Sequence, residues 1–214
     1  MVKTERTGAA VIPLDAMVRE AVDGELEAKR VNLPGEAGVW VLITGDLFTF
    51  MLYFLVFAAG WSADPATFEA GRRQLDASLG FANTLILLTS SWFVVRAVQS
   101  ARAGRRGSVR RNLAGAMFLG LCFAVLKVYG YVHDILAGHT ITTNQFFGYY
   151  FAITGVHFLH VLVGLAVLAI VFQKAGRRDD PSLLVWIESG GCFWHMVDML
   201  WVVLFPMFYL LRAP

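Results

Sequence analysis

Apolar residues gather in five long blocks along the chain, and each block predicts one helix that crosses a membrane. A membrane-spanning helix needs about 20 predominantly apolar residues, and each block meets that length. The blocks are too long and too continuous for the strands of a barrel, and a helix satisfies its own backbone hydrogen bonds in lipid. The sequence therefore predicts an all-α integral membrane protein, a bundle of five transmembrane helices within residues 37–214. The blocks lie near residues 38–60, 80–100, 112–136, 146–173 and 183–211.

The polar segments lie between and before these blocks. Residues 1–36 lack a basic start followed by an apolar core, so they predict a charged cytoplasmic tail and not a cleavable signal peptide. A short helix is expected in this tail near residues 14–29. The longest connection, residues 61–79, is expected to hold a short surface helix after Asp64-Pro65.

The distribution of basic residues predicts the direction of the spans. Hydrophobic residues make up 57% of the chain and charged residues 16%, against roughly 25% charged in a typical soluble domain. Most of the 18 Lys and Arg residues fall in the tail, in the second connection and in the fourth connection, which all lie on one side of the membrane. Basic loops stay cytoplasmic, so we expect a cytoplasmic N-terminus and an external C-terminus. The net charge of +2 gives no reason to expect a nucleic-acid partner.

Ionisable side chains inside the spans are the candidate functional groups, because each costs roughly 2.5–3.5 kcal/mol to insert. Such groups should face the inside of the bundle and pair. At a rise of about 1.5 Å per residue, four of them fall about 8–13 Å from the cytoplasmic side: Asp46, His157, His160 and Glu188. Lys127 and Asp198 fall about 22 Å from that side. We therefore expect a layer of carboxylates and histidines that joins the first, fourth and fifth spans. The seven residues are Asp46, Lys127, His157, His160, Glu188, His195 and Asp198.

Three interpretations of this polar layer remain open. His157 and His160, with nearby carboxylates, have donor types that iron accepts, and either ring could meet His195 across a haem. Carboxylates and imidazoles can also form a proton path, and the simplest interpretation is interhelical hydrogen bonding. We expect the two histidines to be partners for acids on neighbouring helices and not metal ligands. Cys122 and Cys192 have no metal-binding spacing.

Four stretches of the sequence carry a resemblance to a known family. They are "GVWVLITGD" (38–46), "NTLILLTSS" (83–91), "FFGYYFAITGVHFLHVLVGL" (146–165) and "ESGGCFWHMVDMLWVVLF" (188–205). In order and combination they are similar to segments of subunit III of the haem-copper oxidases, which include cytochrome c and quinol oxidases, in the short five-span form. The resemblance covers all but one of the spans strongly.

The resemblance implies a non-catalytic accessory subunit with no catalytic residue, haem, copper or other metal in this chain. It implies that the haem and copper lie in a partner, catalytic subunit I, beside which this chain and subunit II pack. It also implies phospholipid bound in a cleft between the helices, support for proton uptake, and a place in the plasma membrane of a bacterium. Other functions to weigh are a stand-alone proton-coupled transporter and a small haem protein.

The chain departs from the family pattern at two positions. Asp46 stands where the family has a buried glutamate, and Gly130 in "KVYGY" (127–131) stands where the family has another glutamate. Lys127 thereby loses an acidic neighbour one turn away, and we expect its ammonium to turn to Asp198 or to extend outward toward water. Both departures are typical of a divergent branch, such as the subunit III-like proteins that accompany nitric oxide reductases.

Overall fold

The computed structural model describes residues 19, 35–177 and 180–211, and the regular structure in these ranges is helical. Five of its helices are long and apolar enough to cross a membrane, which confirms the predicted spans. The short helix expected after Asp64-Pro65 is also present, whereas the helix expected near residues 14–29 lies outside the described ranges. The elements are α2 (Ala37–Ala63), α3 (Pro65–Arg72), α4 (Ala77–Arg102), α5 (Arg106–Leu136), α6 (Gln145–Ala175), α7 (Leu183–Phe205) and the π-helix η1 (Pro206–Leu210).

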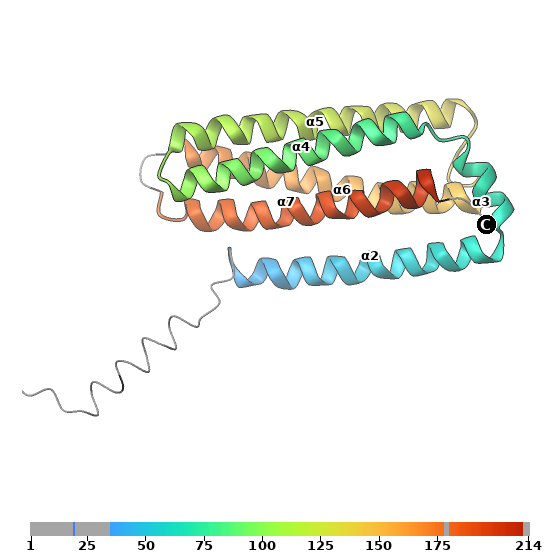
Figure 1. Ribbon diagram of the computed structural model, residues 1–214, viewed down its shortest axis with the longest axis horizontal. Helices are drawn as coiled ribbons and strands as arrows, with labels where there is room; N and C mark the ends of the chain where they lie inside the picture. Colours follow the sequence, from blue (N-terminus) through green and yellow to red (C-terminus); the bar gives the residue numbers. More distant parts are fainter. Residues whose placement is uncertain (1–18, 20–34, 178–179, 212–214) are drawn as a thin grey trace, which may run out of the picture. The chain divides into compact units, whose positions relative to one another are not determined.

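Helix α7 is the most buried span, and it packs against α4, α6 and α2 (Figure 1). Two of its three tryptophans, Trp194 and Trp201, are almost completely buried. Helices α5 and α6 approach Trp194 through glycines: a Cβ atom added at Gly120 or at Gly164 would lie 2.8 Å from the indole ring. Trp194 of α7 therefore fits against one glycine of α5 and one of α6 in the core.

Helix α2 lies at the edge of this group and runs beside α7 (Figure 1). Its C-terminal end is fixed by aromatic packing: the ring of Phe57 lies 4.9 Å from that of Phe208 and 5.3 Å from that of Phe68. Gly60 allows close contact there, because an added Cβ would lie 2.8 Å from the Tyr149 ring. Many of its other side chains are exposed, as lipid-facing residues of a membrane helix are.

Helix α3 turns the chain between α2 and α4. Pro65 occupies its first turn, where a missing N–H costs nothing, and the Asp64 carboxylate accepts a hydrogen bond from the Thr67 N–H. Glu69 accepts two hydrogen bonds from Arg72 and a third from Arg73. The hydrogen bonds from Arg72, and to a smaller extent the one from Arg73, lower the pKa of Glu69 to about 2. Helix α3 is thus held by a charge cluster that persists over the whole physiological pH range.

The last span changes its hydrogen-bond pattern at Pro206. Proline has no N–H to donate to the preceding turn, and the chain continues as a π-helix in which the Leu211 N–H donates to the Pro206 carbonyl at 2.9 Å. The wider turn brings Phe208 and Tyr209 into the core, where both are buried. Arg72 of α3 donates to the Tyr209 carbonyl at 3.4 Å, which joins α3 to this segment.

Candidate functional site

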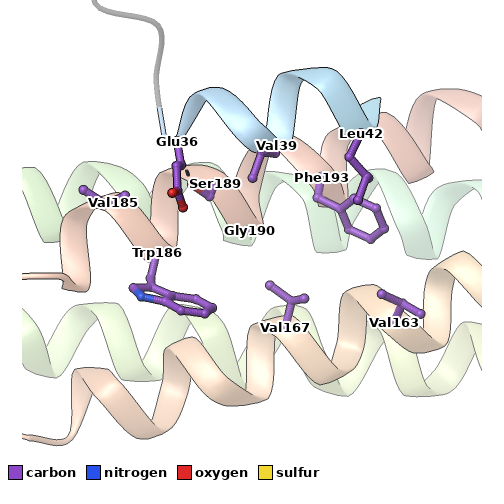
Figure 2. A pocket seen from close by; sticks show the side chains of 10 residues that line it. All are labelled: Glu36, Val39, Leu42, Val163, Val167, Val185, Trp186, Ser189, Gly190 and Phe193. Carbon is purple, nitrogen blue, oxygen red and sulfur yellow. Dashed lines mark hydrogen bonds between the residues drawn. The ribbon is translucent and has the colours of Figure 1, made fainter. Parts of the chain in front are cut away.

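A hollow of about 250 Å³ separates α2 from α6 and α7 near the N-terminal end of α2 (Figure 2). We call it the α2 cleft. Its walls are mainly valine, leucine and aromatic side chains, and Glu36 and Ser189 lie at one end. The residues that line it are Glu36, Val39, Leu42, Val163, Val167, Val185, Trp186, Ser189, Gly190 and Phe193. An apolar hollow with a polar end matches an amphiphilic molecule.

The α2 cleft continues toward the middle of the helices into a second hollow of about 190 Å³. Leu42, Val163 and Phe193 line both hollows, so the two are neighbours along one groove. The second hollow contains a polar pair: Asp46 Oδ1 of α2 lies 3.4 Å from His160 Nε2 of α6. The other ring nitrogen, Nδ1, lies 2.8 Å from the Val156 carbonyl oxygen. The groove is therefore mainly apolar, with Glu36 and Ser189 at the end near the start of α2 and one ionisable pair toward the middle of the helices.

Glu188 of α7 fixes the N-terminal end of α2. One of its carboxylate oxygens accepts a hydrogen bond from the Gly35 N–H at 3.2 Å, and the other accepts from Arg102 of α4 at 2.9 Å. The Glu36 N–H donates to Ser189 Oγ at 2.9 Å. Gly35 has φ +78°, and a Cβ there would lie 2.6 Å from Ser189 Oγ, so this position requires glycine. The Glu188 carboxylate of α7 thus joins α4 to the segment that leads into α2.

The predicted layer of carboxylates and histidines is only partly present. The structure brings Asp46 and His160 together, but it pairs Glu188 with Arg102 and not with a histidine. His157 has no acidic partner: it is fully buried, and neither ring nitrogen has a hydrogen-bond partner among the described residues. His157 and His160 face different neighbours because side chains three residues apart on a helix point in directions that differ by about 60°.

The His157 ring packs inside the bundle among aromatic side chains. Its centroid lies 5.3 Å from that of Trp201 and 6.0 Å from that of Phe123. His160 instead faces α2. The expectation that both histidines are partners for acids is therefore right for His160 and wrong for His157.

His195 and Asp198 form a separate polar group with α4. Ser91 Oγ makes a short hydrogen bond with His195 Nδ1, and Asp198 Oδ2 lies 3.9 Å from the same nitrogen. Asp198 is 4% exposed, and within the described part of the chain its two carboxylate oxygens make no hydrogen bond. Ser91, which the sequence alone did not single out for this role, is thus the hydrogen-bond partner of His195.

The Lys127 side chain does not take either of its predicted positions. It neither pairs with Asp198 nor extends outward: the side chain is buried, and its ammonium donates to Tyr150 Oη at 3.1 Å. The ammonium also lies 4.6 Å from the ring centroids of Tyr131 and Tyr150 and 5.1 Å from that of Trp201. Aromatic faces attract a cation. The tyrosine and tryptophan rings therefore replace the carboxylate that was expected.

Within the described ranges, no group of three or more histidine, cysteine or acidic side chains is placed to hold a metal ion. The arrangement consists of pairs: Asp46 with His160, Glu188 with Arg102, and His195 with Ser91. Such pairs can hold helices together, orient a bound amphiphile or carry a proton.

A comparison with family models matches residues 15–212 to "Cytochrome c oxidase subunit III". Among curated proteins, the chain is 27% identical to the cytochrome c oxidase subunit 3 of a Synechocystis strain, over 81% of this chain and 74% of that protein. It is 29% identical to the cytochrome bo(3) ubiquinol oxidase subunit 3 of Buchnera aphidicola, over 81% of this chain and 92% of that protein. It is 28% identical to the cytochrome c oxidase subunit 3 of Bacillus subtilis, over 86% of this chain and 90% of that protein.

Proposed function

The chain belongs to the cytochrome c oxidase subunit III family, and we propose that it serves as a non-catalytic accessory subunit of a haem-copper terminal oxidase in a bacterial plasma membrane. In this proposal the haem and copper lie in the catalytic subunit I, beside which this chain and subunit II are bound. The chain contributes stability and bound phospholipid, and it supports proton uptake by the complex.

The observation that carries the proposal is the α2 cleft. It lies between helices that cross the membrane, its walls are apolar, and its polar end is formed by Glu36 and Ser189 (Figure 2). A phospholipid has the same division into an apolar chain and a polar head group. We infer that an acyl chain occupies the groove and that its head group lies near the N-terminal end of α2.

The outward face of α2 fits a lipid or protein neighbour in the membrane. Val41 is 76% exposed, Phe48 60% and Leu55 56%. Exposed apolar side chains of a membrane helix need contact with lipid or with another helix. We propose that part of this apolar surface contacts the catalytic subunit and that lipid covers the rest.

The proposed orientation places the N-terminus in the cytoplasm and the C-terminus outside. Its support is the cluster of basic residues at one end of the bundle, which includes Arg102, Arg105, Arg106, Arg110 and Arg111. Basic residues near the ends of spans stay on the cytoplasmic side. In this orientation the polar end of the α2 cleft faces the cytoplasm.

The proposed contribution to proton uptake centres on Asp46 and His160. Both groups can take and release a proton, and they lie partly exposed in the second hollow of the groove, with side-chain exposures of 25% and 20%. A protonatable pair beside the catalytic subunit could hold protons near the entry to its proton path.

Purification of the complex from its native membrane in mild detergent tests the subunit assignment. We expect the chain to copurify with a haem-containing subunit of many spans and with oxygen-reducing activity. Copurification with a nitric oxide reductase would contradict the oxidase assignment and support the other branch. A haem spectrum of the pure, isolated chain, or proton flux through vesicles that hold this chain alone, would contradict the accessory role.

Substitutions in the α2 cleft test the lipid assignment. Val167→Trp should fill the groove, and native mass spectrometry should then detect less phospholipid retained by the complex. Leu52→Trp on the exposed face of α2 is the matched control, because Leu52 is 46% exposed and does not line the groove. Equal lipid retention in the two variants would contradict a lipid in the α2 cleft.

A further inference from the structure

A separate hollow with polar walls lies between the start of α4 and the last turns of α5, near α3. Its volume is about 70 Å³, and it shares no residue with the α2 cleft. We call it the α5 cavity. Its polar walls are formed by Asp76, His133, Asp134, Tyr150 and Tyr209, and Gly130 forms part of its floor.

Gly130 keeps this cavity open. A Cβ atom added there would meet only Leu79 Cδ2, at 3.3 Å, so the space above it is otherwise free. Lys127, Gly130 and Asp134 are three and four residues apart, which places them on one face of α5. The space beside Gly130 therefore lies, along this face of α5, between the buried Lys127 ammonium and the buried Asp134 carboxylate.

The ammonium of Lys127 needs more hydrogen-bond partners than the protein supplies. The side chain is 2% exposed and carries three N–H donors, and its acceptor among the described residues is Tyr150 Oη at 3.1 Å. Tyr150 Oη in turn lies 3.2 Å from Tyr209 Oη. Both tyrosines line the α5 cavity, so the chain of hydrogen bonds from Lys127 ends at its wall.

Asp134 lines the same cavity, within reach of the Tyr150 hydroxyl. It is 7% exposed, and its ion pair in the described part of the chain is a long one, 4.0 Å from Oδ1 to His133 Nδ1. A buried carboxylate with few partners is costly, and water relieves that cost where a polar cavity has room. About 70 Å³ is room for more than one water molecule.

We propose that the α5 cavity is a water-binding site through which Lys127 exchanges protons with the aqueous phase at the α3 end of the bundle. A tyrosine hydroxyl both donates and accepts, so Tyr150 takes a proton from the ammonium as its own proton passes to a cavity water. That water becomes hydronium and can pass the proton on to the aqueous phase; the reverse transfer returns a proton from hydronium to the amine, so a complete cycle leaves no net change of charge. Asp134 supplies the negative charge that balances the ammonium across the cavity.

Cysteine reactivity in the assembled complex tests whether water fills the cavity. Gly130→Cys should react with a small, charged methanethiosulfonate at least tenfold faster than Gly155→Cys, whose Cβ would meet no atom within 4 Å but which does not line the cavity. The unsubstituted complex measures the background from Cys122 and Cys192. If Gly130→Cys does not assemble, Leu79→Cys lines the same cavity and takes its place. Equal rates at the cavity and control positions would overturn the proposal.

A second measurement tests whether that water reaches Lys127. In complex labelled with ¹⁵N-lysine, the Lys127 signal is assigned by its loss in Lys127→Arg, and magnetisation transfer from water to it is measured by solid-state NMR. We expect transfer to the Lys127 amine to be several-fold slower in Gly130→Leu, which fills the cavity, and in Tyr150→Phe, which removes the relay hydroxyl. Transfer that is absent in the unsubstituted complex, or unchanged in both variants, would overturn the proposal.

Discussion

His160 faces two oxygen acceptors at once: the Val156 carbonyl lies 2.8 Å from its Nδ1, and Asp46 Oδ1 lies 3.4 Å from its Nε2. A carbonyl can only accept, so this contact assigns a proton to Nδ1. A neutral ring would then turn its lone pair toward the Asp46 carboxylate. A hydrogen bond between Asp46 and His160 Nε2 would require one further proton on either group.

Substitutions of Asp46 should separate packing from proton binding. The Asp46→Asn amide can donate to His160 Nε2 without a further proton, so α2 should keep its position. Asp46→Val leaves His160 Nε2 without this partner and should cost about 1 kcal/mol. Hydrogen exchange of the amides in the middle of α2, measured by mass spectrometry, should rise about fivefold in Asp46→Val only.

The control for this pair is Thr49→Val, on the exposed side of α2, whose hydroxyl donates to the Gly45 carbonyl of its own helix. It should leave the exchange rate unchanged. If Asp46→Asn and Asp46→Val exchange equally fast, the pair does not hold α2.

Removal of the Glu188 carboxylate should release the N-terminal end of α2. Glu188→Ala leaves the Gly35 N–H and Arg102 without their shared acceptor, and we expect the free energy of unfolding to fall by about 2 kcal/mol. Glu188→Gln retains an acceptor for Gly35 and should lose less. Equilibrium unfolding in mixed micelles measures both, and Glu36→Gln, an exposed carboxylate beside the same junction, should change by no more than about 0.5 kcal/mol.

Glycine substitutions should distinguish close helix contacts from open positions on α6. Gly164→Ala forces a methyl group within 2.8 Å of Trp194 and should destabilise the fold by about 1–3 kcal/mol. Gly155→Ala meets no atom within 4 Å and should be neutral or slightly stabilising, because alanine favours a helix. Thermal unfolding followed by tryptophan fluorescence would decide, and equal effects at both positions would contradict the packing described for Trp194.

The charge cluster of α3 predicts a dependence of stability on pH. Hydrogen bonds from Arg72 and Arg73 lower the pKa of Glu69 from 4.5 to about 2 in the folded protein. The carboxylate therefore stabilises the fold fully above pH 4.5, and this contribution is lost as the pH falls toward 2. Glu69→Gln should lower the melting temperature at pH 7, and the difference from the unsubstituted chain should shrink between pH 5 and pH 3. A difference that stays constant over that range would contradict this assignment.

The sequence predicted the spans well because the length of an apolar block depends on the membrane and not on the neighbours of a helix. It also placed Asp46 and His160 at the same depth, because depth along a helix can be counted from the sequence, and the structure has these two groups 3.4 Å apart. It failed for His157 and Lys127, whose surroundings depend on the rotation of each helix about its axis. The rings around Lys127 come from α5, α6 and α7, and no spacing within one helix reveals such a group.

The two fixed ends of α2 determine how a molecule can enter the groove behind it. Glu188 and Ser189 hold the first residues, and the packing of Phe57 with Phe208 holds the last turns. With both ends held, α2 cannot rotate away from the other helices as a rigid body, and any opening of the groove has to occur at the middle of the helix. In the proposed lipid-binding role, an acyl chain would therefore enter sideways from the surrounding bilayer, and lipid exchange would not require either end of α2 to detach.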